Sequence, residues 1–293
     1  MKRHVFIINP EAGKKKGITL KDYIEESYNN PLILVTSYKG HATKLAKTYA
    51  RPDTVIYSLG GDGTLNEIIN GVLQSEYYHE TIVAVVPCGS GNDFIKGITN
   101  IKDPVELLKR YQKQKVKVID LGKINSRYFT NIASIGFDAL VVHEAKKYKR
   151  IPMVSGEFSY LISIFINLIR LKDYLVSVSV DNQRIIRKRI LFITMANGRY
   201  YGGGMQPAPK ASLDDGQLDF GIIDKVSRMK ALILLPRFIK GKHESLDEVS
   251  VYRGTKLKIK SEQALPINID GEIIWSDNIA VEIEKKALKI LVP

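Results

Sequence analysis

The hydrophobic pattern of the chain changes near residue 122. Before that point, short apolar runs alternate with stretches whose apolar residues recur at helical spacing. This alternation predicts βαβ units and a parallel, doubly wound sheet. The predicted strands are Val5–Asn9, Leu32–Val35, Val55–Leu59 and Ile82–Val86, and the predicted helices are Ile18–Ser27, Ala42–Ala50, Leu65–Leu73 and Pro104–Gln112.

The second part of the chain has a different pattern. β-like segments follow one another through turn signals such as Asp181-Asn182, and two helical stretches, Glu157–Leu171 and Ser227–Ile239, interrupt them. This order predicts a mainly antiparallel β domain with helical insertions. The β-like segments are Val116–Lys123, Tyr128–Ile135, Leu175–Val180, Arg184–Ala196, Gln217–Ile223, Lys256–Lys260, Ile279–Ile283 and Leu288–Val292.

Composition narrows the class of protein. The chain has 293 residues, of which 44% are hydrophobic and 26% charged, as in a soluble globular protein. Its single cysteine, Cys88, excludes an intramolecular disulfide and a Cys-rich zinc site. The longest apolar stretch, Phe158–Leu171, is shorter than the ~20 residues of a spanning helix, and the first residues lack the pattern of a signal peptide. A cytoplasmic protein without a membrane span is therefore expected.

The charge balance predicts an anionic partner. Lys and Arg number 44 against 31 Asp and Glu, which gives a net charge of +13. Such a surface favours nucleic acid, an anionic membrane face or a phosphorylated ligand. Composition alone leaves all three open.

A glycine-rich loop, Gly60-Gly61-Asp62-Gly63-Thr64, follows a predicted strand and opens a predicted helix. Glycines at such a turn let backbone N–H groups approach a phosphate, and the helix dipole adds to the attraction. The carboxylate of Asp62 would repel phosphate unless Mg²⁺ lay between them. Thr64 and Glu67 also have capping-box spacing, so a well-capped turn is the alternative.

Two further loops follow predicted strands. Pro87–Phe94 contains the run Gly89-Ser90-Gly91, and Asn9–Gly17 contains the run Lys14-Lys15-Lys16. Loops at the carboxyl ends of adjacent parallel strands border one crevice, where open α/β sheets bind ligands. The alternatives are an independent helix-starting turn and a solvated lysine run. The P-loop, the dinucleotide fingerprint and the protein-kinase motifs are absent.

Six motifs in order resemble the diacylglycerol kinase catalytic family, above all its small soluble bacterial lipid kinases. The resemblance extends from residue 5 to the C-terminus. The motifs are Asn9-Pro10, Gly60–Glu67, Pro87–Phe94, Ile135–Ala139, Ala196–Gly204 together with Leu213–Gly216, and Asn268–Glu272.

The resemblance implies a fold and an activity. It implies a Rossmann-like nucleotide-binding α/β domain over 1–122 and a β-sandwich lipid-substrate domain over 123–293, as in NAD kinases and diacylglycerol kinases, with strands near 284–293 able to return to the first domain. It implies ATP as phosphoryl donor, Mg²⁺, and a membrane lipid hydroxyl as acceptor. Diacylglycerol, converted to phosphatidic acid, is the expected substrate of an enzyme associated peripherally with the membrane.

The resemblance also implies residue roles. Glu272 matches the general base, and Asp62 matches the acid that positions the catalytic metal. Asp215, with the backbone carbonyls of Ser212 and Gln217, matches a structural or regulatory Mg²⁺ site. The matching nucleotide-contacting positions are Asn9, Pro10, Glu11, Ala12, Gly13, Thr36, Gly60, Gly61, Asp62, Gly63, Thr64, Leu65, Asn66 and Ser90.

Some of these positions are open to other interpretations. Ala12 stands where many family members carry serine, which leaves one phosphate contact in doubt. The residues alone favour ordinary turns at Asp270-Gly271-Glu272 and at Asp214-Asp215-Gly216.

Two basic stretches, His143–Lys172 and Lys225–His243, carry net charges of +4 and +6 with apolar residues between. They suit an anionic membrane surface, and equally helices that pack in the core with solvated lysines. The charge is therefore expected to serve phosphate and membrane, and no nucleic-acid module is present. The rivals are a kinase for another lipid alcohol (sphingoid, phosphatidylglycerol or polyprenol), an NAD kinase-like enzyme, and a non-catalytic nucleotide- or lipid-binding protein. Homodimerisation stays open.

Overall fold

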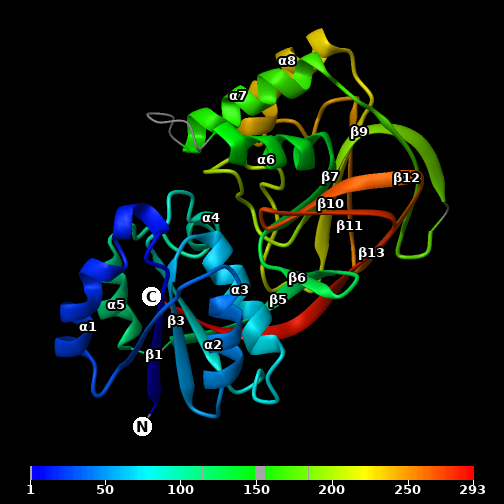
Figure 1. Ribbon diagram of the computed structural model, residues 1–293. Coiled ribbons are helices and arrows are strands. Elements are labelled where there is room, and N and C mark those ends of the chain that lie inside the picture. The colour runs from blue at the N-terminus through cyan, green and yellow to red at the C-terminus, as the bar shows by residue number, and fades with distance from the viewer. Residues whose placement is uncertain (1, 114, 149–155, 184) are drawn as a thin grey trace. The chain divides into compact units, whose positions relative to one another are not determined.

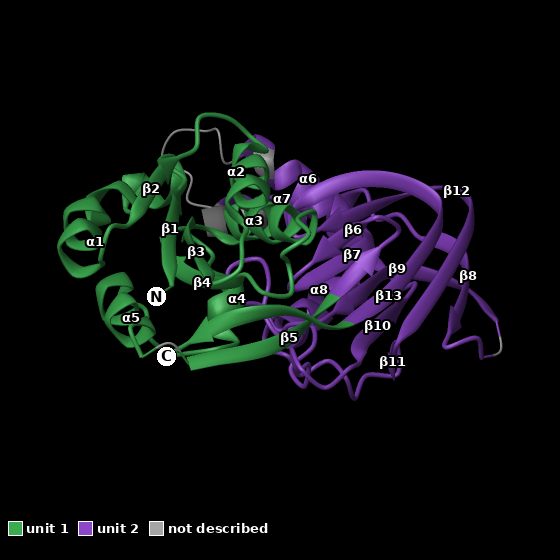
Figure 2. Cartoon of the chain, turned by 90° about the horizontal axis from the view of Figure 1, so that it is seen from below, with its two compact units in different colours: residues 1–121, 285–293 green, residues 122–284 purple. Residues whose placement is uncertain are grey.

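The computed structural model describes residues 1–293 except 1, 114, 149–155 and 184. The chain forms two compact units (Figure 2). Unit 1 comprises Met1–Leu121 together with Lys285–Pro293, and unit 2 comprises Gly122–Glu284. The predicted division near residue 122 can be compared with this one: the first unit ends at Leu121, and the last residues of the chain belong to it.

The sheet of unit 1 is parallel and buried. Its strands run in the order β2-β1-β3-β4, and the end of β13 adds to β4 at Lys289 and Ile290. The predicted parallel sheet is thus confirmed, because runs such as Val-Ile-Tyr-Ser-Leu in β3 are buried on both faces. The bounds are β1 Arg3–Ile8, β2 Leu32–Val35, β3 Thr54–Gly60, β4 Ile82–Pro87 and β13 Glu272–Val292.

Helices cover both faces of this sheet (Figure 1). α2 (His41–Tyr49) and α3 (Asp62–Leu73) pack together on one face. α1 (Lys21–Ser27) and α5 (Pro104–Tyr111) lie on the other, where the hydroxyl of Tyr28 donates to the carbonyl of Leu108 at 2.9 Å. The strand order reverses between β1 and β3, so a ligand crevice is expected beyond the carboxyl ends of these two strands.

Unit 2 is built on antiparallel strands. The long strands β9 and β12 each pair with both β7 and β8, so these four strands close on one another. Buried side chains from all four strands form one core, which agrees with the predicted β domain. β5 (Lys115–Ile124) begins in unit 1 and ends in unit 2. The other bounds are β6 Arg127–Phe129, β7 Ile132–Gly136, β8 Tyr174–Val180, β9 Ile186–Ala196, β10 Leu218–Asp224, β11 Val249–Gly254 and β12 Lys256–Ile269.

Three helices gather at one end of unit 2 (Figure 1): α6 (Phe137–Tyr148), α7 (Gly156–Ile169) and α8 (Arg228–Ile239). They pack on apolar side chains of β9 and β10 and form a second core. α7 and α8 match the two predicted helices, whereas α6 was not predicted. In the part of the chain that the structure describes, no helix combines the length and the apolar character needed to cross a membrane.

Several predicted segments differ from the structure, among them Lys256–Lys260, which is only the start of β12. Tyr128–Ile135 is two strands, β6 and β7, because the backbone N–H groups between them bond the carboxylate of Asp270 instead of a neighbouring strand. Ile279–Ile283 and Leu288–Val292 are parts of one strand, β13. β11 was not predicted.

Candidate active site

The first glycine-rich loop leads directly into α3, which begins at Asp62 with Gly61 as its N-cap. The predicted capping box is wrong, because both of its side chains bond elsewhere. The hydroxyl oxygen of Thr64 accepts a hydrogen bond from the side-chain amide of Asn9 at 2.9 Å, and Glu67 accepts one from the N–H of Gly40 at 2.9 Å. A helix N-terminus without a capping side chain favours an anion, since its dipole and first N–H groups attract negative charge.

The loops after β1, β3 and β4 meet at backbone level. The N–H of Asn9 donates to the carbonyl of Leu59, and that of Cys88 to the carbonyl of Gly60, each at 3.0 Å. A Cβ on Gly89 would lie 2.4 Å from the Cα of Gly61, which leaves no room for any side chain there.

The loop after β1 is fitted equally tightly. Gly13 has a φ of +53°, and a Cβ on it would lie 1.9 Å from the carbonyl oxygen of Cys88. Lys14 and Lys15 also have positive φ, a conformation that costs energy in residues with side chains. Glycine at the contact point lets this lysine-bearing loop lie against the loop after β4.

All the predicted nucleotide-contacting positions belong to unit 1 and lie at the carboxyl ends of its strands. Thr36 follows β2, and its N–H donates to the carbonyl of Ile8 at 2.9 Å. Ser90 is exposed in the loop after β4, where the side chain of Asn92 accepts from the N–H of Gly89 at 2.9 Å and donates to its carbonyl at 2.7 Å. Their contacts with a nucleotide remain a prediction.

Asp62 connects the first two glycine loops. Its carboxylate accepts a hydrogen bond from the N–H of Phe94 at 3.0 Å, at the start of the short helix α4 (Asp93–Lys96). The side chain predicted to position a metal therefore also fixes the loop after β4. Cys88 lies buried beside it, and burial raises the pKa of its thiol to about 11. This thiol is protonated at neutral pH, so it is no candidate nucleophile.

Glu272 begins β13 after the two-residue turn Asp270-Gly271, whose φ angles are +44° and +93°. The residues alone predicted this turn, and its positive φ angles are typical of a tight hairpin. Asp270 has a structural role: its carboxylate accepts from the N–H and the hydroxyl of Thr130 at 2.6 and 2.8 Å. The side chain of Glu272 is 41% exposed and lies 3.5 Å from the guanidinium of Arg127. Asp270 is thus committed to the loop after β6, and the role of Glu272 as general base remains a prediction.

Asp215 has an arginine partner. Its carboxylate accepts from the N–H of Gln217 at 3.0 Å and forms an ion pair with Arg253, whose Nε lies 3.0 Å from Asp219. Burial raises the pKa of Asp219, and Arg253 opposes that rise. The hydroxyl of Ser212 bonds Asp214 at 2.9 Å.

Arg253 thus supplies positive charge at the place where Mg²⁺ was predicted. Among the described residues, no group of three or more His, Cys, Asp or Glu side chains could hold a metal ion. The predicted site is of another kind, because it combines one carboxylate with the backbone carbonyls of Ser212 and Gln217, and it remains a prediction.

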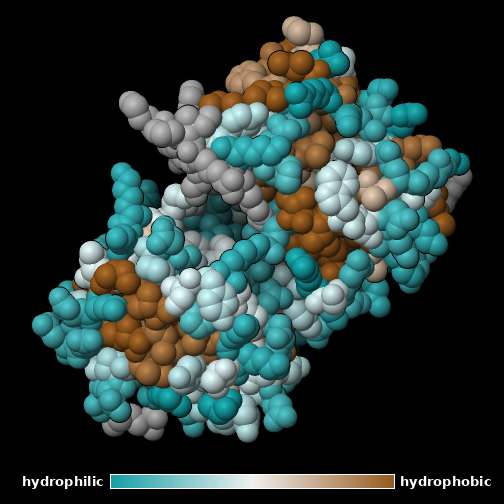
Figure 3. Space-filling model, viewed as in Figure 1, coloured by the Kyte–Doolittle hydropathy of each residue, from teal (hydrophilic) through white to brown (hydrophobic). Residues whose placement is uncertain are grey.

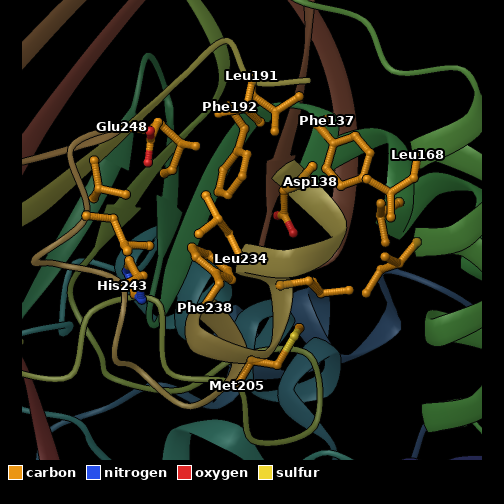
Figure 4. Close-up of a pocket in the computed structure, with 18 of the residues that line it drawn as sticks. Phe137, Asp138, Leu168, Leu191, Phe192, Met205, Leu234, Phe238, His243 and Glu248 are labelled. Atoms are coloured by element: carbon orange, nitrogen blue, oxygen red, sulfur yellow. The ribbon is translucent and has the colours of Figure 1, made fainter. Parts of the chain in front are cut away.

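An apolar cavity of about 70 Å³ in unit 2 was not predicted. Figure 4 shows Phe137, Leu168, Phe192 and Phe238 around it, with Asp138 among them. Side chains of α6, α7, α8 and β9 form most of its wall.

Two buried polar residues belong to the cavity wall. The hydroxyl of Tyr201 donates to the carboxylate of Asp138 at 2.6 Å, and the hydroxyl of Ser134 donates to the same carboxylate. Both Asp138 and Tyr201 lie within the motifs Ile135–Ala139 and Ala196–Gly204, so the sequence contained a signal for them. It gave no sign that they meet.

Two family models divide the chain between them. The diacylglycerol kinase catalytic domain matches residues 3–124, and the YegS C-terminal NAD kinase beta sandwich-like domain matches residues 131–292. The chain belongs to the diacylglycerol kinase family. It is a lipid kinase, that is, a phosphotransferase, and kinases of this family use ATP. The resemblance seen in the motifs is confirmed.

Individual relatives agree with this assignment. A diacylglycerol kinase of Bacillus subtilis is 27% identical over 93% of this chain and 90% of its own length, and one of Staphylococcus haemolyticus is 28% identical over 91% and 81%. The crystal structure of a diacylglycerol kinase from Bacillus anthracis covers all of this lipid kinase and 97% of that chain, with a TM-score of 0.77 at 20% identity. An NAD kinase from Archaeoglobus fulgidus in complex with ATP has a TM-score of 0.54 at 15% identity, over 98% of this chain and 92% of its own. The two structures confirm the predicted fold class.

Proposed function

We propose that this lipid kinase transfers the γ-phosphoryl group of ATP to the free hydroxyl of diacylglycerol. The products are phosphatidic acid and ADP, and Mg²⁺ enters with the nucleotide. The choice of diacylglycerol rests on the likeness to the Bacillus subtilis and Staphylococcus haemolyticus diacylglycerol kinases over about nine tenths of the chain. The enzyme works in the cytoplasm, where ATP is abundant, at the surface of the membrane that holds its acceptor.

The three loops of unit 1 are the proposed nucleotide site. Their backbones meet at the carboxyl ends of β1, β3 and β4, and α3 begins there without a capping side chain. Such a site binds phosphates through N–H groups and the helix dipole. Lys14, Lys15 and Lys16 add exposed positive charge to the loop after β1. Asp62 would hold the Mg²⁺ that accompanies ATP and offset the charge of the phosphates.

Glu272 is the proposed general base. An alcohol has a high pKa, so a carboxylate that accepts its proton as the new O–P bond forms lowers the barrier. Glu272 is partly exposed, and its ion pair with Arg127 at 3.5 Å is weak enough to open. The rigid hairpin held by Asp270 keeps the base in one position.

The apolar cavity of unit 2 supports a lipid acceptor. Its wall of Leu, Ile, Val and Phe side chains would gain free energy by covering an acyl chain. The pair Asp138–Tyr201 gives one part of the wall the polar groups that a glycerol backbone requires.

The test is phosphoryl transfer by the purified full chain from radiolabelled ATP with Mg²⁺. Each reaction contains one acceptor: diacylglycerol, phosphatidylglycerol, sphingosine or a polyprenol in mixed micelles, or NAD in water. Label is expected in phosphatidic acid, and Asp62→Asn should abolish it while Asp53→Asn, an exposed aspartate of unit 1, should not. Label only on another acceptor, or on none, would overturn the proposal.

A further inference from the structure

The helix α7 packs Ile164 and Leu168 in the second core, but it also buries polar side chains and exposes apolar ones. Ser163 and Asn167 are buried: the hydroxyl of Ser163 donates to the carbonyl of Val141 at 2.7 Å, and Asn167 donates to the carbonyl of Ser163 at 2.9 Å. Phe165 and Ile169 are instead 53% and 68% exposed, and Leu161 is exposed one turn earlier. Residues four apart share one face of a helix. A surface helix in water normally shows the opposite arrangement.

The neighbouring helix α8 exposes a second apolar stripe. Met229, Leu232 and Ile233 are exposed, at spacings that place them on one face, whereas Leu235 and Phe238 pack on the core beneath. α7 and α8 contact one another, and Figure 3 shows brown, hydrophobic surface over this end of unit 2. We call the exposed set the α7–α8 face, which consists of Leu161, Phe165, Ile169, Met229, Leu232 and Ile233.

Basic residues without acidic partners border this face. Six lysines and arginines lie on the two helices or directly beside them in sequence. Within the described part of the chain, none of these six forms an ion pair. Two others nearby are neutralised, Lys225 by Asp173 and Lys230 by Glu248. The unpaired residues are Arg170, Lys172, Arg228, Arg237, Lys240 and Lys242.

Part of the first basic stretch is outside the described residues. Lys149 and Arg150 are outside the residues that the structure describes, as is the side chain of Lys146. The described residues thus answer the open question about α7 and α8: one side of each helix packs in the core, and the other side is an exposed apolar face bordered by basic residues.

We propose that the α7–α8 face docks this kinase on a bilayer that contains anionic phospholipid. Its apolar side chains enter the boundary between headgroups and acyl chains, and the basic residues bind the lipid phosphates. This inference rests on the proposed function only in that the acceptor is a membrane lipid. A second copy of the chain is a poor occupant, because a symmetric contact would bring the same unpaired cations together.

The first test is vesicle binding by the full chain in the absence of ATP. Vesicles of phosphatidylcholine mixed with phosphatidylglycerol are compared with vesicles of phosphatidylcholine alone in a flotation assay. Ile233→Ser is expected to weaken binding about tenfold, and the double variant with Phe165→Ser about a hundredfold. The matched control is Ile185→Ser, because Ile185 and Ile233 are both 67% exposed and Ile185 lies between β8 and β9. Equal binding by Ile233→Ser and Ile185→Ser would overturn the proposal.

The second test separates charge from apolar contact. Arg237→Gln together with Lys240→Gln should lower affinity for anionic vesicles about fivefold per charge, and added salt should do the same. Lys102→Gln with Lys113→Gln removes equal charge from unit 1 and should have a smaller effect. If both pairs weaken binding equally, only net charge matters and the α7–α8 face is not the docking surface.

Docking and catalysis can fail independently. Ile233→Ser should phosphorylate a short-chain, water-dispersed diacylglycerol like the unaltered chain, because Ile233 does not line the cavity. Normal vesicle binding with no kinase activity would contradict the proposed function alone. If light scattering shows a dimer that Ile233→Ser dissociates while vesicle binding is unchanged, the face is a subunit interface and the docking proposal is wrong.

Discussion

The glycine loops of unit 1 and the helical end of unit 2 are built in different ways. The backbones of the loops contact one another directly. Their N–H groups donate hydrogen bonds to carbonyls of the neighbouring loop at 3.0 Å, and the loops approach so closely at Gly89 that no side chain fits there. The helical end is made of side chains, which leave a cavity of about 70 Å³ and a large exposed apolar surface. A phosphate chain has one fixed chemistry, so a rigid backbone cradle suits it. A lipid varies in length and shape, so a wall of apolar side chains suits it better.

The largest expected effect tests whether unit 2 supplies the general base of the reaction as well as the lipid-binding surface. Glu272→Gln keeps the shape of the side chain and removes its basicity. We expect kcat to fall by ~10²-fold or more, about 2.7 kcal/mol or more of barrier, while the Kd for ATP is unchanged.

The matched control for this prediction is Glu262→Gln, which removes an exposed carboxylate of unit 2 paired with Arg187. Its turnover should equal that of the unaltered chain. Near-normal turnover of Glu272→Gln would show that unit 2 binds the lipid and leaves proton removal to another group.

The close packing of the unit 1 loops can be tested by adding one methyl group at Gly89. In Gly89→Ala the new Cβ would lie 2.4 Å from the Cα of Gly61, so the two loops must separate. We expect the free energy of unfolding to fall by about 2 kcal/mol, with weaker ATP binding.

Gly63→Ala is the control in the same loop, since nothing lies within 4 Å of its would-be Cβ. Because alanine favours helix, this variant should be as stable as the unaltered chain or slightly more so. The measurement is the free energy of unfolding of the two variants in urea. Equal values for Gly89→Ala and Gly63→Ala would mean that the loops are not closely packed.

The sequence predicted the parts of the fold that depend on local pattern. The buried strands of unit 1 and the helices α7 and α8 have strong apolar periodicity and clear ends. α6 has a helical signal too, because Phe137, Val141 and Ala145 are spaced four apart and buried. It was not predicted, although Gly136, with a φ of +91°, ends β7 directly before it.

Only the part of the candidate site that follows from local sequence, the three loops at the ends of parallel strands, could be predicted. The meeting of the three loops follows from parallel strands that end at one edge. The capping box failed because Glu67 finds its partner in Gly40, 27 residues away in sequence. The ion pair between Asp215 and Arg253 spans 38 residues, and the cavity depends on how three helices fill space. Such contacts are decided by tertiary packing.

The cavity should accommodate an enlarged side chain, whereas the loops should not. Ala231 on α8 lines it, and Ala231→Ile adds apolar volume where room exists. The KM for long-chain diacylglycerol should rise about tenfold, since the added side chain occupies space needed by the acyl chain. Short-chain diacylglycerol and ATP serve as internal controls, with unchanged KM. A uniform loss with both acceptors would show general distortion of the unit.

The smallest expected effect compares a buried histidine of unit 2, His243, with a half-buried histidine of unit 1, His4. In unit 2, Nε2 of His243 lies 3.1 Å from the carbonyl of Pro207, which can only accept a hydrogen bond, so Nε2 carries a proton. Among the described residues, Nδ1 of His243 has no hydrogen-bond partner, so protonation there would bury a charge. Burial lowers the pKa of His243, and in unit 1 burial likewise lowers the pKa of His4.

A histidine with a lowered folded pKa takes up its proton more readily in the unfolded chain. Its contribution to stability is therefore present above the unfolded pKa of about 6.5 and is lost as pH falls from there towards the folded value. The Tm should accordingly fall between about pH 7 and about pH 5. His243→Gln should reduce this slope without abolishing it, because His4 supplies the rest, whereas the exposed His79→Gln should leave it unchanged. An equal slope in His243→Gln and His79→Gln would mean that water reaches His243 and that the helical end of unit 2 is more open than its packing indicates.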